Sequence, residues 1–385
     1  MAFAIAGGVV WTGRSDEPAR AGTVTVEGER IVDAVGDGTT VERIDARGCT
    51  VIPGLIEAHA HLCFNAAADW RAVYDADGAE RMLLRMAAAG EAMLRAGITT
   101  VRDLGAPTAL AIALRDAVRA GVTSGPDLLV AGAPITTTGG HCFFMGGEAD
   151  GEPGLRVAVR TLVKAGVDWI KVMASGGNMT PGSNPYRAQY SIAELTAVVE
   201  EAHRLGRRVA AHCHGVEGIR VAVAAGCDTL EHCSFQTPDG ATPDDAVIAE
   251  IAARGLVVSP TITSAFGQTL GSPRWERRAE LLRRIFAAGC RVLMSTDCGI
   301  PNTPHAGLAG AIQSLAAAAG LSPVAMLCLA TSRSAELLGL DDRGVIAAGR
   351  RADLLIVEGD PTVDLAALER VRAVIARGRI VRHGT

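Results

Sequence analysis

The 385-residue sequence lacks the features that mark a membrane protein or a nucleic-acid-binding protein. Nowhere do 18 apolar residues follow one another, and the N-terminus, MAFAIAGGVVWTG, has neither a basic region nor a long apolar stretch. The net charge is −5 without any run of like charges, so no basic patch indicates binding to nucleic acid or to an anionic membrane surface. We expect a soluble, cytoplasmic protein that acts on a small molecule, has no nucleic-acid or membrane partner, and forms a homo-oligomer.

The sequence also lacks a cysteine framework. Its nine cysteines are an odd number, are scattered along the chain, and include no CxxC pair. This pattern excludes both a network of disulfides and a structural zinc knuckle. We expect reduced thiols.

Short apolar runs alternate with amphipathic helical patterns across the middle of the chain. Many of the helical patterns end on a glycine just before the next apolar run, as at Gly166, Gly226 and Gly289, where a left-handed C′ residue is expected. Eight such βα units predict an α/β fold of the (β/α)8 TIM-barrel type. The eight runs are GLIEAHAHLC (54–63), TTVRDLG (99–105), DLLVAGAPITT (127–137), WIKVMASGG (169–177), RVAAHCHG (208–215), DTLEHCSF (228–235), LVVSPTITS (256–264) and RVLMSTDCG (291–299).

The two ends of the chain have a different pattern. Stretches such as GTVTVEGERIVDAVG and ADLLIVEGD alternate with period two around Gly and Asp turns, which is typical of strands. Neither end is long enough to form a good core alone, and chain termini often lie close together. We therefore predict one small β-sandwich domain from residues 1–53 and 340–385 beside a barrel domain of residues 54–339.

Residue types that bind metals lie at the ends of several predicted strands. In a barrel of this type the catalytic groups lie at the C-terminal ends of the strands. A lone histidine there is more often a satisfied core residue, and a lone aspartate more often caps a helix. The set as a whole predicts a site for zinc or a similar divalent ion, because four histidines and an aspartate converge on one end. Its members are His59, His61, Lys171, His212, His232 and Asp297.

Together these motifs resemble the amidohydrolase superfamily of metal-dependent hydrolases. The resemblance follows PGLIEAHAHL, the lysine of DWIKVMASGG, AAHCHG, TLEHCS and STDCG in order, and it covers essentially the whole chain. ITTTGGHC and AQYSIAELTAVVEEAHRLGRRVAAHCHG are most similar to the prolidase-like, dipeptide-cleaving branch, with imidazolonepropionase-like relatives. The sequence departs from the pattern of this branch at two positions, and both departures bear on which substrate is bound. Cys233-Ser234-Phe235 stands where many members have a tyrosine after the strand-6 histidine, and Cys298 stands after the strand-8 aspartate where a small residue or serine is usual.

The resemblance implies a binuclear centre of two divalent ions, expected to be zinc. It assigns the first ion to His59, His61 and Asp297 and the second to His212 and His232, with Lys171, carbamylated by carbon dioxide, as the bridge. Two ions about 3.5–4 Å apart can share a water and supply hydroxide at neutral pH. Asp297 would act as general base and then general acid in cleaving the amide bond of a dipeptide or an N-acyl amino acid.

Four further residues are candidate substrate contacts. The resemblance implies that His141, in TTTGGHCFF, stabilises the oxyanion, although a mobile loop histidine is the alternative. His214 is expected to contact substrate or to support a ligand, and Arg187 and Tyr190 could bind a carboxylate, although Arg187 could equally be solvated. Glu231 is expected to face away from His232 and to be structural, whereas Asp103 is expected to orient a ligand or to cap a helix.

Two other functions are compatible with the pattern. Hydrolysis of a cyclic amide or an imidazolone ring would use the same residues. A non-catalytic scaffold or binding protein on a barrel without metals is disfavoured, because none of the expected ligands is missing from the sequence.

Overall fold

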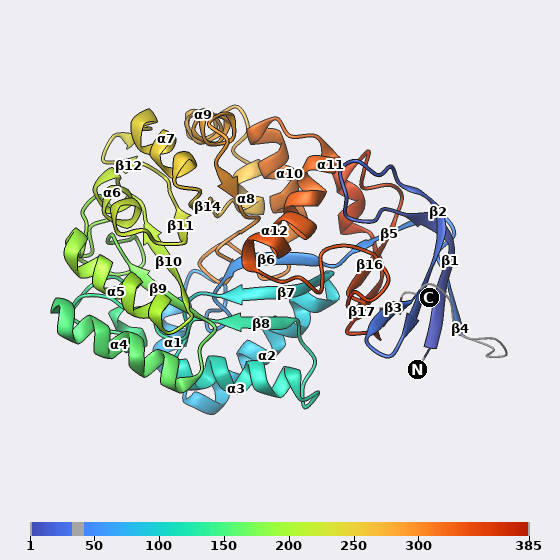
Figure 1. The fold of residues 1–385 in the computed structure, drawn as a ribbon, viewed down its shortest axis with the longest axis horizontal. Coiled ribbons are helices and arrows are strands. Elements are labelled where there is room, and N and C mark those ends of the chain that lie inside the picture. Colours follow the sequence, from blue (N-terminus) through green and yellow to red (C-terminus); the bar gives the residue numbers. More distant parts are fainter. Residues whose placement is uncertain (1, 33–41, 384–385) are drawn as a thin grey trace.

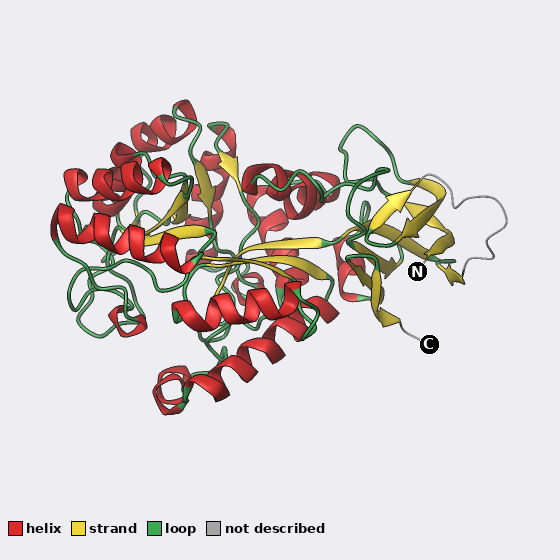
Figure 2. Cartoon of the chain, turned by 60° about the horizontal axis from the view of Figure 1, so that its bottom comes forward, coloured by secondary structure: helices red, strands yellow, loops and turns green. Residues whose placement is uncertain are grey.

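The computed structural model describes residues 2–32 and 42–383. Each of the eight apolar runs contains a strand, and helices lie between them on the outside of the molecule (Figures 1 and 2). The central strands are β6 (Leu55–Ala60), β7 (Ile98–Asp103), β8 (Asp127–Val130), β9 (Trp169–Met173), β10 (Arg208–Cys213), β11 (Thr229–His232), β14 (Val257–Ser259) and β15 (Arg291–Val292). Strands β12 (Gln236–Thr237) and β13 (Gly240–Ala241) form a short hairpin.

The central strands run parallel in two assigned sheets, one of β6, β7 and β8 and one of β9, β10, β11, β14 and β15. Backbone hydrogen bonds link the edges of these sheets on both sides. Between β8 and β9 the N–H of Asp168 donates to Val130 O at 2.8 Å, and next to β15 the N–H of Ala58 donates to Met294 O at 3.1 Å. The C-terminal ends of β6 and β15 therefore lie side by side although they are far apart in sequence.

Local sequence explains where several helices begin and end. Helix α5 begins at a capping box in which Ser191 and Glu194 bond each other's backbone N–H groups. Helices α4 and α6 end at Gly166 and Gly226, whose φ of +99° and +80° are positive, as a left-handed C′ residue requires. The helices are α1 (Trp70–Ala76), α2 (Ala79–Arg95), α3 (Thr108–Arg119), α4 (Gly151–Ala165), α5 (Ile192–Arg204), α6 (Val216–Ala225), α7 (Asp245–Ala253), α8 (Ser264–Gly267), α9 (Pro273–Ala287), α10 (Leu308–Ala319), α11 (Pro323–Cys328) and α12 (Ser334–Leu338).

Both ends of the chain join one eight-stranded sheet beside the central strands (Figure 1). Strand β5 pairs antiparallel with β16, which connects the N-terminal and C-terminal segments. Side chains from both segments, among them Phe3, Val51 and Ile356, share one buried core. The predicted sandwich of two sheets is therefore not confirmed, since the hydrogen bonding gives one sheet. Its strands are β1 (Ala2–Val10), β2 (Arg20–Glu27), β3 (Arg30–Val32), β4 (Glu42–Asp45), β5 (Cys49–Pro53), β16 (Leu354–Glu358), β17 (Val371–Ala376) and β18 (Arg379–His383).

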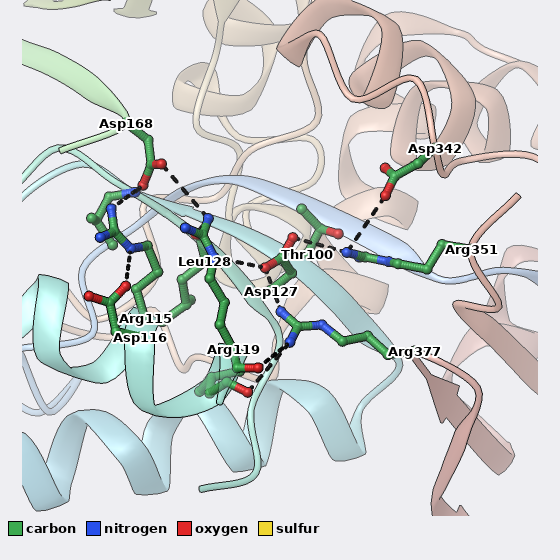
Figure 3. A network of polar contacts seen from close by, with 12 residues as sticks. Thr100, Arg115, Asp116, Arg119, Asp127, Leu128, Asp168, Asp342, Arg351 and Arg377 are labelled. Atoms are coloured by element: carbon green, nitrogen blue, oxygen red, sulfur yellow. Dashed lines mark hydrogen bonds and ion pairs between the residues drawn. The ribbon is translucent and has the colours of Figure 1, made fainter. Parts of the chain in front are cut away.

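A buried ion-pair network fastens this sheet to the central strands. Asp127, at the start of β8, accepts hydrogen bonds from Arg343 (2.6 Å), Arg351 (3.0 Å) and Arg377 (2.6 Å). Figure 3 shows Arg351 and Arg377 converging on this carboxylate from the C-terminal segment. Burial alone would raise the pKa of Asp127, but the guanidinium groups, Arg343 and Arg351 foremost, hold it well below its usual range.

Within residues 2–32 and 42–383, no helix is long and apolar enough to cross a bilayer. The cytoplasmic location and the homo-oligomeric state stay predictions from the sequence.

Candidate metal centre

The predicted metal ligands gather at the C-terminal ends of the central strands. Backbone hydrogen bonds between the first and last strands place Asp297 beside the HxH pair. The N–H of Asp297 donates to His59 O at 2.9 Å, and the N–H of His61 donates to Cys298 O at 2.8 Å. Two segments at opposite ends of the central series therefore supply one group of side chains.

His59, His61 and Asp297 form a first donor group, whose candidate ligand atoms all lie within 4.8 Å of one another. Asp297 Oδ1 is 3.1 Å from His61 Nε2 and 3.3 Å from His59 Nε2. Within residues 2–32 and 42–383, neither His59 Nε2 nor Asp297 Oδ1 makes a hydrogen bond, although both atoms are buried. Leaving such atoms unpartnered is costly, and His and Asp are ligands that suit zinc, so this group fits a divalent cation.

A second donor group contains His212, His214 and His232, again with candidate ligand atoms within 4.8 Å of one another. His232 Nε2 lies 2.8 Å from His212 Nδ1. Burial and the neighbouring imidazole of His214 lower the pKa of both rings well below the usual value, so both are neutral at pH 7, as metal ligands must be. The ring centroids of His59 and His232 are 5.1 Å apart, so the two groups are adjacent.

Lys171 lies on β9 with 1% of its surface exposed. Its Nζ has no hydrogen-bond partner among the residues that the structure describes. Burial lowers the pKa of the ammonium group, against the opposing effect of Glu231 and Asp297. A buried amine that is driven toward its neutral form is the species that can react with carbon dioxide.

Each ligand ring is held by a hydrogen bond at one of its two nitrogens. For His59, His61 and His212 the partner is a carboxylate or a carbonyl, which can only accept, so the bonded nitrogen carries the proton and the other nitrogen has its lone pair available for a metal. The contacts are His59 Nδ1 with Glu231 Oε2 (2.7 Å), His61 Nδ1 with Gly105 O (3.0 Å), His212 Nε2 with Gly176 O (3.0 Å) and His232 Nδ1 with Thr261 Oγ1 (2.9 Å).

Glu231 has a more direct role than the sequence suggested. Its carboxylate not only contacts His59 but also accepts hydrogen bonds from Arg102 Nη2 (2.9 Å) and Thr229 Oγ1 (2.5 Å). Burial alone would raise the pKa of this carboxyl, but Arg102 and His59 lower it well below its usual range. Strand alternation predicts that the side chain of Glu231 lies on the opposite face of the strand from that of His232. It does not show that His59, a ligand from another strand, lies on the face of Glu231.

Three other residues support the site. Nothing in the sequence indicated Glu57 or Arg278, and the sequence left two roles open for Asp103. Glu57 accepts hydrogen bonds from the N–H of His59 (3.0 Å) and from the hydroxyl of Thr296 (2.6 Å), and burial raises its pKa to about 7. Arg278, on α9, donates from Nη2 to the carbonyl of His232 at 3.0 Å. Asp103 was expected to orient a ligand or cap a helix; it accepts from the N–H of Leu62 at 3.0 Å and so holds the chain just after the HxH pair.

The structure brings His141 to the second donor group, with its ring centroid 4.7 Å from that of His212. Its Nδ1 is buried and has no hydrogen-bond partner in the part of the chain that the structure describes, and burial lowers the pKa of the ring to about 3. Gly177 makes room for the ring, because a Cβ atom there would lie 2.4 Å from His141 Nε2. The loop is held by Gln189, whose Oε1 accepts from the N–H of His141 at 2.7 Å, so this histidine is anchored at its backbone.

Of two further predicted substrate contacts, Tyr190 points away from the metal ligands, whereas Arg187 lies in the loop beside Gly176. The hydroxyl of Tyr190 donates to Ala149 O at 2.9 Å, and the ring belongs to the hydrophobic core, so the structure does not bring this residue to the site. Arg187 is exposed, and its guanidinium makes no hydrogen bond or ion pair within the described part of the chain. Aromatic and basic residue types in a loop carry no information on the direction of their side chains.

Comparison with known proteins places this geometry in a family. The model of the amidohydrolase family matches residues 50–381. Ochratoxinase from Aspergillus niger is 29% identical over 84% of this chain and 73% of its own length. Imidazolonepropionase from Streptomyces avermitilis is 25% identical over 93% of this chain and 86% of its own length. The structure of a prolidase complexed with N-methylphosphonate-L-proline is 30% identical with a TM-score of 0.86, over 100% of both chains.

Proposed function

The chain belongs to the amidohydrolase family, and from this membership and the two donor groups we propose a binuclear zinc hydrolase that cleaves the amide bond of a dipeptide or an N-acyl amino acid. The family and its relatives make the chain an enzyme, a hydrolase of carbon–nitrogen bonds in small molecules. The proposal goes further in naming the metal, the number of ions and the substrate class. One observation carries it: among the described residues, the buried atoms that lack a hydrogen-bond partner include His59 Nε2, Lys171 Nζ and Asp297 Oδ1, all on predicted ligands.

In the proposed centre, His59, His61 and Asp297 would hold one ion, and His212 and His232 would hold the other. Lys171, as a carbamate, would supply the ligand that the two ions share. Bound divalent ions supply a Lewis acid for the scissile carbonyl and lower the pKa of a water molecule. The ligand rings are held in place by hydrogen bonds from their other nitrogens to Glu231, Gly105, Gly176 and Thr261.

Asp297 and His141 carry out the remaining steps. With one carboxylate oxygen on the metal, the other oxygen of Asp297 can accept a proton from the attacking water and pass it to the departing amine. Without that proton the amine is a poor leaving group. His141 can donate a hydrogen bond to the oxygen that becomes negative during attack, since its ring is buried beside His212 and its Nδ1 has no partner among the residues described.

We also propose the domain division expected from the sequence, with residues 54–339 as a closed (β/α)8 barrel and residues 1–53 and 340–385 as the second domain. Barrel closure is supported by the hydrogen bonds that join the edges of the two parallel sheets. The family and the structural neighbours imply a TIM-barrel fold.

The test is a substrate screen with purified protein reconstituted with zinc in bicarbonate buffer. We expect about two equivalents of metal, and turnover that falls by about 10²–10⁴-fold in Asp297→Asn. The matched control is Asp245→Asn, an exposed carboxylate on α7, which should keep full turnover. Full activity in a metal-free preparation would contradict the proposal.

Hydrolysis of a cyclic amide or an imidazolone ring is the second candidate. It is favoured by the match to imidazolonepropionase over 93% of this chain. Dipeptides, N-acyl amino acids and cyclic imides assayed in parallel on one preparation will separate the two. The substrate class with the highest kcat/KM decides between them.

A further inference from the structure

One arginine outside the proposed ligand set contacts two strand ends at the metal centre. Arg278 lies in the second turn of α9, and its Nη2 donates to His232 O at 3.0 Å and to Pro260 O at 2.5 Å. We propose that Arg278 is a positioning residue for the second ion, because it holds His232 and Thr261 in left-handed backbone conformations. The inference rests on the proposed function only in that the second donor group binds an ion.

Both carbonyls that Arg278 contacts belong to peptide groups that lead into left-handed residues. The carbonyl of His232 precedes Cys233, and φ is +66° and +40° at these two residues. The carbonyl of Pro260 precedes Thr261, whose φ is +51°. A residue other than glycine keeps such a conformation only where its surroundings enforce it. Hydrogen bonds from a charged donor are strong enough to be that constraint.

The two turns meet at the ring of His232. Its Nδ1 lies 2.9 Å from Thr261 Oγ1, and its Nε2 lies 2.8 Å from His212 Nδ1. Arg278 therefore holds the backbone of a ligand and also the backbone next to the residue that contacts the ring of this ligand. Because such outer contacts orient a metal ligand, the direction of the His232 ring depends on both turns.

Helix α9 is anchored independently of the donor groups. The side chain of Ser272 accepts from the N–H of Trp275 at the start of the helix. The ring of Trp275 stacks on that of Phe266, with the centroids 4.5 Å apart. Arg278 follows Trp275 by about one turn, so its main chain has a fixed position from which the guanidinium reaches the strand ends.

A guanidinium is a costly group for this contact. Its Nη1 is buried and has no hydrogen-bond partner within residues 2–32 and 42–383, and over the same residues Arg278 forms no ion pair with a carboxylate. An apolar side chain of similar length would avoid the cost of burying this charge. Stability of the fold alone therefore does not account for an arginine here, whereas the orientation of His232 does.

The experiment compares wild type with Arg278→Met and Arg278→Lys. Methionine fills part of the space without a donor, and lysine keeps the charge on a shorter side chain. Arg274→Met is the matched control, because Arg274 is an exposed residue of the same helix. The zinc affinity of each ion is measured by competition with a chromogenic chelator, the coordination by the visible spectrum of Co²⁺, and stability as Tm.

We expect the affinity for the second zinc ion to fall by about 10–100-fold in Arg278→Met, with a smaller fall in Arg278→Lys and none in Arg274→Met. The first ion should keep its affinity in all variants, and the Co²⁺ spectrum should change only at the second equivalent. A residue that merely stabilised the fold would lower Tm and leave the affinity and the spectrum of the second ion as in wild type.

The ring of His232 is also observed without any ion, in the full chain stripped of metal and labelled with ¹⁵N-histidine. Its signals are assigned with His232→Gln, and in Arg278→Met they should shift or broaden. Unchanged signals in the folded variant, or an unchanged affinity for the second ion, would overturn the inference. If Arg278→Met does not fold, Arg278→Lys decides by the same two criteria.

Failure of the proposed function gives a different result. Wild type that binds a single ion, or that hydrolyses no amide, would contradict the proposed function. The signals of His232 in the metal-free chain would still show whether Arg278 holds the ring.

Discussion

Glu231 Oε2 lies 2.7 Å from His59 Nδ1, and both side chains are closed to solvent. The contact joins β11 to β6 beneath the proposed metals, and Arg102 keeps the carboxylate ionised from its other side. A charged carboxylate in this position fixes the ring of His59 and makes Nε2 a better electron donor.

Glu231→Gln should therefore weaken metal binding. The amide keeps the shape of the side chain but loses the charge, and we expect the affinity for Zn²⁺ to fall by about 10–100-fold. Competition with a chromogenic chelator measures the affinity. Glu250→Gln, an exposed change on α7, is the control. Unchanged zinc affinity in Glu231→Gln would show that the contact does not tune the ligand.

Gly177→Ala should damage the site without unfolding the chain. The new methyl group would lie 2.4 Å from His141 Nε2, so the ring has to move away from His212. We expect kcat to fall by about 10²-fold, since loss of a single oxyanion donor costs that much or more. Steady-state kinetics and the metal count are the measurements. Gly154→Ala is the control, because a Cβ there meets no atom within 4 Å; equal kinetics in the two variants would contradict the prediction.

Tyr190→Phe should leave the kinetics unchanged and lower stability. The hydroxyl donates to Ala149 O away from the metal ligands, and its loss leaves that carbonyl without this donor. We expect a loss of about 0.5–1.5 kcal/mol, measured as a lower Tm, with KM unaltered. A raised KM at constant Tm would restore the expectation that Tyr190 contacts substrate.

Asp127 should make stability depend on pH in the acid range. Its pKa is lower in the folded chain than in the unfolded chain, where it is about 3.9. The stability that the ion pairs provide is therefore complete above about pH 5 and is lost as the pH falls below the unfolded value. Asp127→Asn should be destabilised by about 3–5 kcal/mol at pH 7, because it removes the buried carboxylate that three guanidinium groups share.

The measurement is Tm between pH 3 and pH 7. The difference between wild type and Asp127→Asn should shrink as the pH falls. Asp116→Asn, a largely exposed carboxylate paired with Arg115, should change Tm little at any pH. A constant difference between wild type and Asp127→Asn would mean that the carboxylate does not carry the effect.

The sequence predicted the eight strands and the ligand types because both follow local rules. Period-two spacing places His59 and His61 on one face, and apolar runs separated by helical patterns indicate βα units. The supporting contacts depend on residues far apart in the chain. Nothing near Glu231 indicates that it reaches His59, and nothing in the loop after β9 indicates that Tyr190 turns into the core.

The first donor group joins the first and the last strand of the central series, since His59 lies in β6, His61 follows it and Asp297 follows β15. An ion bound there is a removable cross-link that closes most of the chain into a loop. Like any such link, it restricts the unfolded ensemble more strongly as the loop grows longer. Metal supply would then govern how long the enzyme survives in a cell as well as how fast it works.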